Sequence, residues 1–342
     1  MKRIGVLGAG TWGMALARML ANNGHSVTVW SAVEQEIDEF STTRRHPNLP
    51  GMVIPDAIAF TKDIAEACRG KEILLFSVPS PFVRSTARKA APYVTGEQII
   101  VDVAKGIEAD TLFTMTQIIE DELKNPAVPL VALSGPTHAE EVARDLPTTI
   151  VSACKDETAA RLVQEVFSNN CMRVYINDDV IGVELCGAMK NIIALASGIA
   201  VGLGCGDNAR AALITRGIVE IARLGTAMGC KEQTFGGLAG IGDLIVTATS
   251  MHSRNNRCGM LLGQGVAPAD AVKQVGMVVE GINALPAAMR LMEMYHVEMP
   301  IVETVNAIVS GSAAAADAVH MLMSRDQKPE LPASVFDNHY DK

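Results

Sequence analysis

Residues 4–20 read IGVLGAGTWGMALARML, so an apolar run typical of a β-strand passes through three glycines into a pattern typical of a helix. In a turn of this kind Gly8 permits the tight bend and Gly10 lets the backbone approach a bound pyrophosphate. Gly13 lets the helix pack closely on the strand. The amino end of the helix then presents its free N–H groups to the anion. The spacing therefore predicts a phosphate-binding turn between a first strand and a first helix.

A second β-type run follows this helix at residues 26–30, and the order of strand, turn, helix and strand is the context of a dinucleotide-binding unit. A glycine-rich surface turn is the alternative, and it would require none of these flanking elements. We therefore predict that the turn binds the pyrophosphate of NAD or NADP.

The residue that would distinguish the two dinucleotides is an acid about 20 positions further on, which would bind the ribose 2′-hydroxyl of NAD and repel a 2′-phosphate. The second strand ends near the neutral residue Ala32, and Glu34 and Glu36 come slightly later. Arg44 and Arg45 lie downstream, where they would either meet a 2′-phosphate or only face solvent in a loop. Both NAD and NADP therefore remain open.

Short β-type runs alternate with helical patterns up to about residue 178, and this alternation predicts βαβ units around a mostly parallel, doubly wound sheet. From residue 180 onward strand signals disappear, and long segments rich in Ala, Leu, Ile and Gly predict closely packed helices. We therefore expect a Rossmann-type α/β domain at 1–178, an all-α domain at 179–323 and a poorly ordered tail at 324–342. The expected strands are 3–7, 26–30, 73–77, 99–103, 130–134 and 149–152, and the expected helices are 11–22, 81–91, 180–203, 208–228, 267–273, 281–296 and 300–309.

The composition limits the partners and the compartment. The chain has 342 residues, with 29 Lys and Arg against 38 Asp and Glu, so its formal net charge of −9 argues against nucleic acid as a partner. Seven cysteines without a C-x-x-C pair argue against a disulfide framework and against a metal site of zinc type. The longest apolar stretch, 192–203, is shorter than the ~20 residues that span a bilayer, and the opening apolar run is too short for a signal peptide. We therefore expect a cytoplasmic protein without membrane insertion.

Six further motifs point to one family. They are VAKGIE at 103–108, SGPTHA at 134–139, ELCGAMKN at 184–191, GDNARAALITRG at 206–217, GIGDL at 240–244 and SRN at 253–255. With the glycine turn, they make the chain resemble bacterial NAD(P)-dependent glycerol-3-phosphate dehydrogenase from about residue 3 to about residue 323. The resemblance implies a 6-phosphogluconate dehydrogenase-like architecture and a homodimer. It also implies the reversible reduction of dihydroxyacetone phosphate to sn-glycerol 3-phosphate, which supplies glycerophospholipid biosynthesis.

The same resemblance implies which residues form the site. Lys190 would be the catalytic general acid and base, and Asp243 would be its catalytic partner. The implied substrate residues are Lys105, Gly135, Thr137, Lys190, Asn191, Asp243, Thr247, Ser253, Arg254 and Asn255. The implied dinucleotide residues are Gly8, Gly10, Thr11, Trp12, Gly13, Lys105, Ala139, Arg254, Val279 and Glu280. Ala32 departs from the family, whose members often carry a polar or basic residue after the second strand.

The chemistry of ketone reduction agrees with these assignments. The carbonyl oxygen needs a proton donor, and an apolar helix around Lys190 would lower the pKa of the ammonium toward neutrality by desolvation. The alternative is a lysine that extends to solvent at a helix end. Asp243 would orient that ammonium, or it would cap the helix that begins at Leu244. Lys105 follows a strand at the binding edge of the sheet, where a surface lysine is the alternative.

The substrate phosphate needs donors outside the dinucleotide site. Arg254 and Asn255 offer a charged fork and a neutral amide side by side, whereas the alternative for residues 251–257 is a polar loop. His25 and His138 have no evident carboxylate partner, so we expect both to be structural.

Two other functions remain to be compared with this one. A related two-domain reductase of a hydroxyacyl or sugar-acid substrate would share the glycine turn and the helical domain, but it would not be expected to carry GIGD at 240–243 together with SRN at 253–255. A dinucleotide-sensing module would bind NAD(P)H without turnover, and it would have no need of Lys190, Asp243 and Arg254 together.

Overall fold

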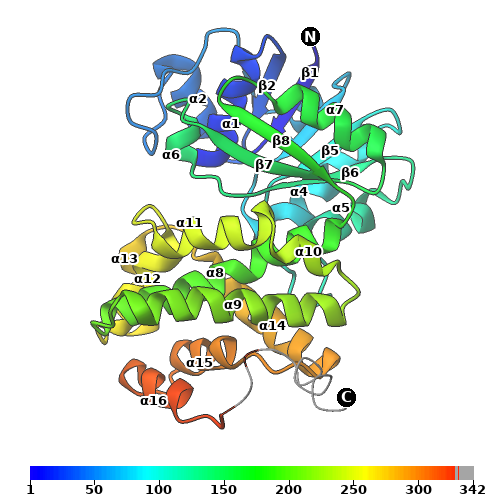
Figure 1. Cartoon of the computed structure of the whole chain (residues 1–342). Helices are drawn as coiled ribbons and strands as arrows, with labels where there is room; N and C mark the ends of the chain where they lie inside the picture. Colours follow the sequence, from blue (N-terminus) through cyan, green and yellow to red (C-terminus); the bar gives the residue numbers. More distant parts are fainter. Residues whose placement is uncertain (328–329, 331–342) are drawn as a thin grey trace.

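The chain folds into a sheet domain followed by a helical domain (Figure 1). The computed structural model describes residues 1–327 and 330. Of the tail expected at 324–342, residues 328–329 and 331–342 lie outside the described residues. The predicted fold class, a doubly wound α/β domain joined to an all-α domain, is confirmed.

The sheet has eight strands in the order β3-β2-β1-β4-β5-β6-β7-β8, and only the pairing of β6 with β7 is antiparallel. The strand order reverses between β1 and β4, so the glycine turn after β1 lies at the topological switch point where open α/β sheets bind ligands. The strands are β1 (Arg3–Leu7), β2 (Ser26–Trp30), β3 (Ala59–Thr61), β4 (Ile73–Phe76), β5 (Ile99–Asp102), β6 (Leu130–Ser134), β7 (Thr148–Ala153) and β8 (Met172–Asn177).

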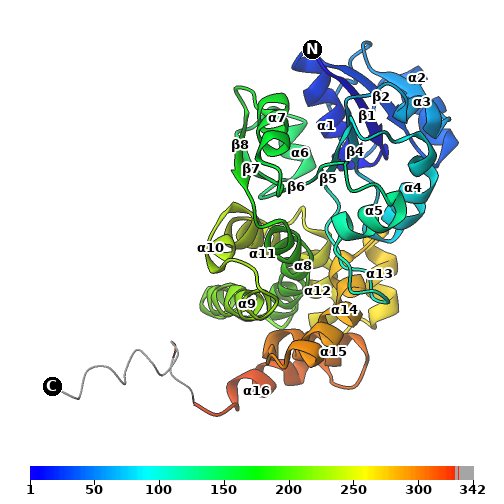
Figure 2. The same cartoon turned by 90° about the vertical axis from the view of Figure 1, so that its right-hand side faces the viewer.

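Helices cover both faces of the sheet (Figure 2). On one face the apolar side chains of α1, α6 and α7 pack in a common core with β1, and on the other face α3, α4 and α5 do the same. The helices of this domain are α1 (Thr11–Asn22), α2 (Glu34–Thr43), α3 (Ile64–Cys68), α4 (Val83–Ala90), α5 (Met115–Leu123), α6 (Ala139–Val142) and α7 (Glu157–Phe167).

Two edge strands were missed by the sequence patterns. The β3 strand spans only the three residues Ala59–Thr61, which is too short for an alternating pattern to be visible. The β8 strand, Met172–Asn177, begins with alternating buried and exposed side chains. It comes after the last predicted strand, 149–152, and it pairs only with β7. Both strands take part in the sheet through pairing with distant segments, which local sequence does not report.

The second domain is built around α8 (Val180–Gly202), a helix of 23 residues whose neighbours enclose it. By length and composition alone α8 is apolar enough to cross a membrane, but 89% of its apolar window is buried inside the protein. The apolar stretch counted at 192–203 makes up most of the second half of this helix, and buried polar residues such as Lys190 lie in its first half. The remaining helices are α9 (Asp207–Ala227), α10 (Glu232–Phe235), α11 (Asp243–Thr249), α12 (Arg254–Gly263), α13 (Pro268–Val275), α14 (Glu280–Tyr295), α15 (Pro300–Val309) and α16 (Ala318–Met323).

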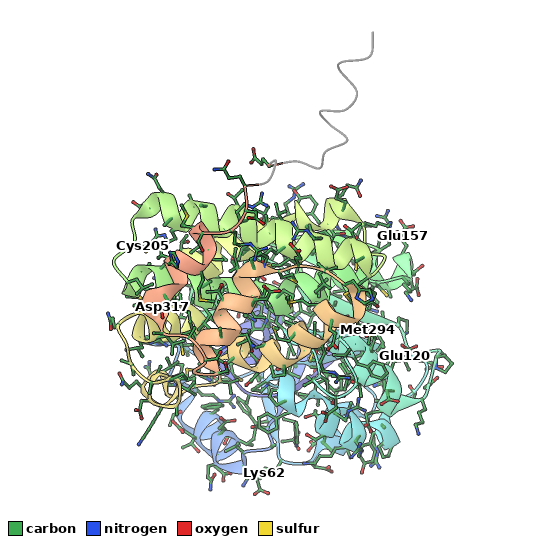
Figure 3. All side chains as sticks on the ribbon, turned by 90° about the horizontal axis from the view of Figure 1, so that it is seen from below. Lys62, Glu120, Glu157, Cys205, Met294 and Asp317 are labelled. Atoms are coloured by element: carbon green, nitrogen blue, oxygen red, sulfur yellow. The ribbon has the colours of Figure 1, made fainter. Side chains whose placement is uncertain are left out.

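Glycines let α12 approach α8 closely. A Cβ atom on Gly198 would lie 2.1 Å from the carbonyl oxygen of Asn256, and one on Gly259 would lie 2.1 Å from that of Leu195. Because the two backbones almost touch, α12 is held at a definite position on α8, and its amino end is directed toward the sheet domain. The helices α15 and α16 lie at the opposite end of the molecule, nearest the viewer in Figure 3, where Asp317 marks the turn before α16.

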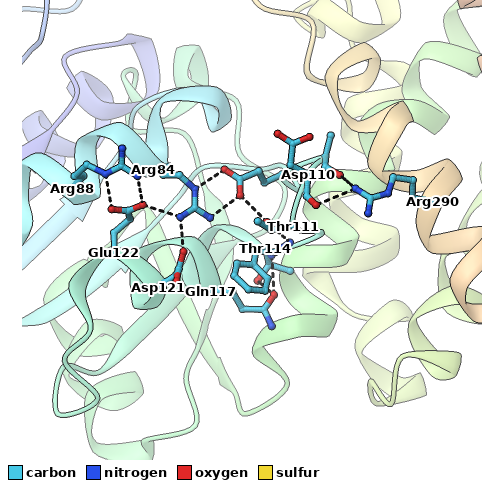
Figure 4. A network of polar contacts seen from close by, with 12 residues as sticks. Arg84, Arg88, Asp110, Thr111, Thr114, Gln117, Asp121, Glu122 and Arg290 are labelled. Atoms are coloured by element: carbon cyan, nitrogen blue, oxygen red, sulfur yellow. Dashed lines mark hydrogen bonds and ion pairs between the residues drawn. The ribbon is translucent and has the colours of Figure 1, made fainter.

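The segment between β5 and α5 is held by both domains (Figure 4). Arg84 on α4 donates two hydrogen bonds to Glu108, at 2.7 and 2.6 Å. From the helical domain, Arg290 on α14 donates to the carbonyl oxygens of Ala109 and Asp110. This segment carries Lys105, so contacts from two sides restrict the position of that lysine.

A buried carboxylate strengthens the same connection. Glu184 on α8 accepts from the N–H and the hydroxyl of Thr116 at 2.8 and 2.6 Å, and from the hydroxyl of Thr114 at 2.7 Å. Burial raises the pKa of Glu184 above its ordinary value, while these three hydrogen bonds act in the opposite direction. The helical domain thereby holds the amino end of α5 in place.

The glycine turn gives a stability prediction with a matched control. A Cβ atom on Gly13 would lie 2.3 Å from the carbonyl oxygen of Gly8 and 2.4 Å from Oγ of Ser77, whereas one on Gly10 would meet nothing within 4 Å. We expect Gly13→Ala to lower the free energy of unfolding by about 1–3 kcal/mol and Gly10→Ala to change it by less than about 1 kcal/mol. Urea unfolding of both variants measures this. Equal stability of Gly13→Ala and the wild type would contradict the close packing.

Candidate active site

The turn after β1 has the conformation that the sequence predicted. Gly8 has φ +120°, and its N–H donates to the carbonyl oxygen of Trp30 at 2.8 Å, which joins the turn to the end of β2. Ser77, after β4, donates its hydroxyl to the carbonyl oxygen of Gly8 at 2.9 Å. Within the described structure no side chain caps the amino end of α1, so its first N–H groups are free to bind an anion in the open space beside Gly10.

Thr11 and Trp12 begin α1, directly after the turn. The Thr11 hydroxyl oxygen accepts a hydrogen bond from Nδ2 of Asn48 at 3.3 Å. Trp12 is half-buried and packs against the core of the sheet domain. The contacts of both residues with a dinucleotide stay a prediction.

Two lysines from different domains share one buried carboxylate. Asp243, at the start of α11, is 1% exposed. Its Oδ1 accepts from Nζ of Lys190 on α8 at 2.6 Å, and its Oδ2 accepts from Nζ of Lys105, after β5, at 2.7 Å. Each oxygen of the carboxylate therefore neutralises one ammonium group, and the three charges form a bridge between the domains.

Further oxygens complete the surroundings of the two ammonium groups. Lys190 also donates to the hydroxyl of Thr247 at 2.6 Å, and that hydroxyl donates to the carbonyl oxygen of Asp243 one turn earlier in α11. Lys105 also donates to the carbonyl oxygen of Gly135 at 3.2 Å and to the Thr137 hydroxyl at 3.4 Å. Six of the predicted substrate residues thus lie in one hydrogen-bonded group.

The surroundings set the protonation of this group. Burial lowers the pKa of Lys190 to about 7, with the negative charge of Asp243 opposing the shift and the positive charge of Lys105 adding to it. Burial would raise the pKa of Asp243, but the two lysines outweigh burial and hold that pKa below its ordinary value. The group therefore combines an ionised carboxylate with an ammonium that titrates near neutral pH.

The geometry excludes three of the alternatives left by the sequence. Lys190 is 5% exposed and does not extend to solvent, and Lys105 is bonded in the site. Gly242, not Asp243, is the N-cap residue of α11, and the Asp243 side chain makes no capping hydrogen bond. The Asp243 carboxylate instead binds the two lysines, one with each oxygen.

Arg254 is the first residue of α12, after the N-cap Ser253. Its side chain is half-buried and, among the described residues, has no hydrogen-bond or ion-pair partner. Burial lowers the pKa of this guanidinium, and the carboxylates of Glu280 and Glu140 oppose that shift. A half-buried cation without a partner, at the amino end of a helix, favours an anionic ligand.

Asn255 has a structural role that the sequence did not indicate. Its Nδ2 donates to Oδ1 of Asn191 at 2.9 Å, and its Oδ1 accepts from the N–H of Gly281 at 2.9 Å. The side chain therefore joins α12 to α8 and α14. The sequence analysis instead predicted that its amide would donate to the substrate phosphate beside Arg254. Side chains at consecutive helix positions point in different directions, which separates the two. A contact of Asn255 or Asn191 with substrate stays a prediction.

The predicted dinucleotide residues of α14 lie beside a residue that the sequence did not assign. Glu280, the first residue of α14 after the N-cap Val279, accepts from the hydroxyl of Ser80 at 2.6 Å and from its N–H at 3.2 Å. Ser80 follows β4, so this contact brings α14 to the binding edge of the sheet. Ala139 begins α6 at the same edge. The signal for Ser80 was only its position between two prolines, and nothing local predicts a partner 200 residues away.

Two histidines lie where a structural role was expected. His25 accepts from the N–H of Lys2 at 3.1 Å, and its other ring nitrogen lies 3.2 Å from the carbonyl oxygen of Val166. His138 Nε2 lies 3.4 Å from the carbonyl oxygen of Val246. A cavity of about 370 Å³ between α8, α9, α15 and α16 is lined by none of the predicted site residues.

A phosphate-binding turn at the switch point of the sheet, and a buried lysine supplied by a helical second domain, define a two-domain dinucleotide-dependent oxidoreductase. Two family models match the chain, the N-terminal part of NAD-dependent glycerol-3-phosphate dehydrogenase over residues 3–160 and its C-terminal part over 179–320. The chain belongs to the NAD-dependent glycerol-3-phosphate dehydrogenase family. The predicted resemblance and the NAD(P)-dependent enzyme class are thereby confirmed.

Relatives support the same assignment over nearly the whole chain. A glycerol-3-phosphate dehydrogenase (NAD(P)+) from Lactobacillus delbrueckii subsp. bulgaricus is 65% identical over 97% of this chain and 99% of its own length. One from Bacillus subtilis is 46% identical over 97% of this chain and 96% of its own. A crystal structure of glycerol-3-phosphate dehydrogenase from Coxiella burnetii superimposes with a TM-score of 0.90 at 37% identity, covering 95% and 99% of the two chains.

The shared carboxylate gives a prediction about proton binding. Without the charge of Asp243, the buried ammonium of Lys190 loses its main electrostatic support. We therefore expect Asp243→Asn to lower the pKa of Lys190 below its value of about 7. The ¹³Cε chemical shift of lysine, titrated by NMR with Lys190→Arg as the assignment control, measures this. An unchanged or raised pKa would show that Asp243 does not stabilise the cation.

Proposed function

We propose that this enzyme reduces dihydroxyacetone phosphate to sn-glycerol 3-phosphate, and oxidises it in reverse, with Lys190 as the general acid and base. The observation that carries the proposal is the bridge of Lys190, Asp243 and Lys105 between the two domains. The bridge places a proton donor of suitable pKa at the edge of the sheet where a dinucleotide binds.

The turn after β1 suits the pyrophosphate of a dinucleotide. The space beside Gly10 and the free N–H groups of α1 suit a pyrophosphate, and the Ser77 contact holds the turn in shape. When bound, NAD(P)H supplies the hydride for the carbonyl carbon. The protein's own task is then to hold the ketone and to supply the proton.

Proton delivery falls to Lys190. As the carbonyl oxygen gains negative charge, the ammonium donates a proton to it, and in the reverse direction the neutral amine accepts one. Asp243 and Thr247 fix the position of Nζ through contacts of 2.6 Å each. Lys105 donates to Asp243 and to the carbonyl oxygen of Gly135, and from this position it supports the developing oxyanion and the substrate.

The phosphate of the substrate is assigned to Arg254. Among the described residues its guanidinium has no hydrogen-bond or ion-pair partner. The Ser253 oxygen accepts from the N–H of Asn256, so the Ser253 hydroxyl can still donate its hydrogen to a phosphate. Charge-assisted hydrogen bonds from a planar guanidinium suit a phosphate group. This local set of donors explains how a chain with a net charge of −9 binds an anion.

Family membership weighs against the two other functions. A hydroxyacyl or sugar-acid reductase would belong to a different family, and the match to glycerol-3-phosphate dehydrogenases covers both domains. A sensor without turnover would not need a buried lysine with a pKa of about 7. We further propose that the enzyme works as a cytoplasmic homodimer, supplies glycerophospholipid synthesis and binds no nucleic acid. The acidic net charge supports the absence of a nucleic-acid partner, and the free cysteines among the described residues support a reducing compartment. The homodimer and the supply of lipid synthesis are what the family resemblance implies.

The first functional prediction concerns the proton donor. We expect Lys190→Met to lower kcat for ketone reduction by about 10²–10⁴-fold, because general acid catalysis is lost. Binding of NADH, followed by its fluorescence, is expected to stay within about threefold of the wild type. Lys89→Met, at an exposed position on α4, is the control. Turnover near the wild-type rate in Lys190→Met would remove this lysine from the proton-transfer role.

The same lysine sets a pH profile. Only its protonated form donates, so kcat for reduction is expected to fall as the pH rises through about 7. For oxidation of the alcohol the neutral amine is needed, so that rate is expected to rise over the same range. Parallel pH profiles of the two directions at saturating substrates test this. A reduction rate that stays constant to pH 9 would be the contrary result.

The second functional prediction concerns the phosphate. We expect Arg254→Ala to raise KM for dihydroxyacetone phosphate by about 10- to 100-fold at saturating NADH, because charge-assisted hydrogen bonds are lost. Arg257→Ala, at an exposed position one turn further along α12, is the matched control and should leave KM within about twofold. If both variants gave the wild-type KM, the phosphate would have to bind elsewhere.

A further inference from the structure

We infer that Ser31 and Glu36 together replace the single acid that usually follows the second strand, and that this pair makes the enzyme prefer NADH to NADPH. The inference rests on the proposed dinucleotide site and deepens it by naming the form of the cofactor. It concerns the end of β2, where the sequence left NAD and NADP open.

The end of β2 lies directly beside the phosphate turn. The N–H of Gly8 donates to the carbonyl oxygen of Trp30 at 2.8 Å, so the next residue, Ser31, is adjacent to the turn. In this fold the ribose next to the adenine is recognised at this point, and its 2′-substituent distinguishes the two dinucleotides. Ser31 therefore occupies the position at which an acid would accept a hydrogen bond from the ribose 2′-hydroxyl.

Ser31 holds the carboxylate of Glu36 at that point. Its hydroxyl donates to Oε2 of Glu36 at 2.6 Å and accepts from the N–H of Val33 at 3.1 Å, and the residue is 5% exposed. Glu36 is half-buried in the first turn of α2, and its other oxygen, Oε1, has no partner among the described residues. A carboxylate held in this way can accept a hydrogen bond from a ribose hydroxyl.

The position of Glu36 is also close to the turn itself. The pKa of the buried His46 is lowered by burial, and the backbone of Ala9 and the charges of Glu36 and Glu39 oppose this shift. His46 thus lies within reach of both the glycine turn and the Glu36 carboxylate. A negative charge at this place opposes a second negative charge on the ribose.

Of the two arginines that the sequence offered for a 2′-phosphate, Arg44 is engaged by other groups. Arg44 donates to the carbonyl oxygen of Ile58 at 2.9 Å, lies 5.3 Å from the ring centre of Phe60 and pairs with Asp56 at 3.8 Å. Arg45 is exposed to solvent. The guanidinium of Arg44 is therefore committed to the loop before β3.

Two further carboxylates, Glu34 and Asp38, lie on α2 with Glu36. Lys62 pairs with Asp38 at 2.8 Å and with Glu34 at 3.6 Å. The amino end of α2 would attract a phosphate, but Glu34 and Glu36 occupy its first turn. A 2′-phosphate would thus approach carboxylates whose neighbouring cations Lys62 and Arg44 already have partners, whereas the 2′-hydroxyl of NADH would find an acceptor.

Binding and turnover with both dinucleotides test the inference. For the wild type we expect Kd and kcat/KM to favour NADH over NADPH by about tenfold or more, from one like-charge contact near the surface. Glu36→Gln should reduce this ratio at least about threefold by improving NADPH, and Ser31→Ala should reduce it by freeing the carboxylate. Glu120→Gln, an exposed acid on α5, is the control and should leave the ratio unchanged.

The outcomes separate the inference from the proposed function. Dissociation constants measured by fluorescence do not depend on dihydroxyacetone phosphate, so an enzyme inactive with that ketone still reports the preference. Equal or tighter binding of NADPH by the wild type would overturn the inference. An unchanged ratio in Glu36→Gln would overturn the role of the carboxylate, and an unchanged ratio in Ser31→Ala would overturn the role of the hydroxyl.

Discussion

The carboxylate of Asp243 is the anion on which the arrangement of the two domains depends. It is almost fully buried and accepts hydrogen bonds from two ammonium groups, that of Lys190 on α8 and that of Lys105 in the segment after β5. A buried charge is costly to remove from water unless it is paired, so the carboxylate and the two lysines are stable only when the domains are together. Burial alone would neutralise Lys190, and the shared anion instead keeps its pKa near 7. The same contact therefore pairs the buried charges and holds the proton donor that we propose.

Several other contacts restrict the segments that carry this site. Glu184 binds the amino end of α5, Arg290 binds the backbone before it, and Glu280 binds Ser80 after β4. All three come from the helical domain and reach loops at the carboxyl edge of the sheet. Because loops at this edge hold the ligands of open α/β folds, the helical domain shapes the dinucleotide side of the site as well as supplying Lys190.

The sequence predicted the parts of this protein that depend on local order. The strand, the three glycines and helix Thr11–Asn22 were predicted with their bounds, because spacing along the chain alone defines a tight turn followed by a helix. Edge strands β3 and β8 were missed, since each is defined by its pairing with one distant strand. Asn255 was predicted to donate to the substrate phosphate, whereas its amide forms hydrogen bonds with Asn191 and Gly281 that join three helices.

By itself the sequence determined the fold class, the place of the glycine turn and the residues proposed for the site, because short-range spacing and motif order carry that information. Only the tertiary structure decided how those residues work together. Lys105 and Asp243 are separated by 138 positions and Ser80 and Glu280 by 200, and no local pattern relates residues so far apart. The pairing of Ser31 with Glu36 shows the same limit at short range, since it depends on the direction in which α2 leaves β2. Charge pairing and burial are properties of the packed molecule, and they convert a set of candidate residues into a site with a definite protonation state.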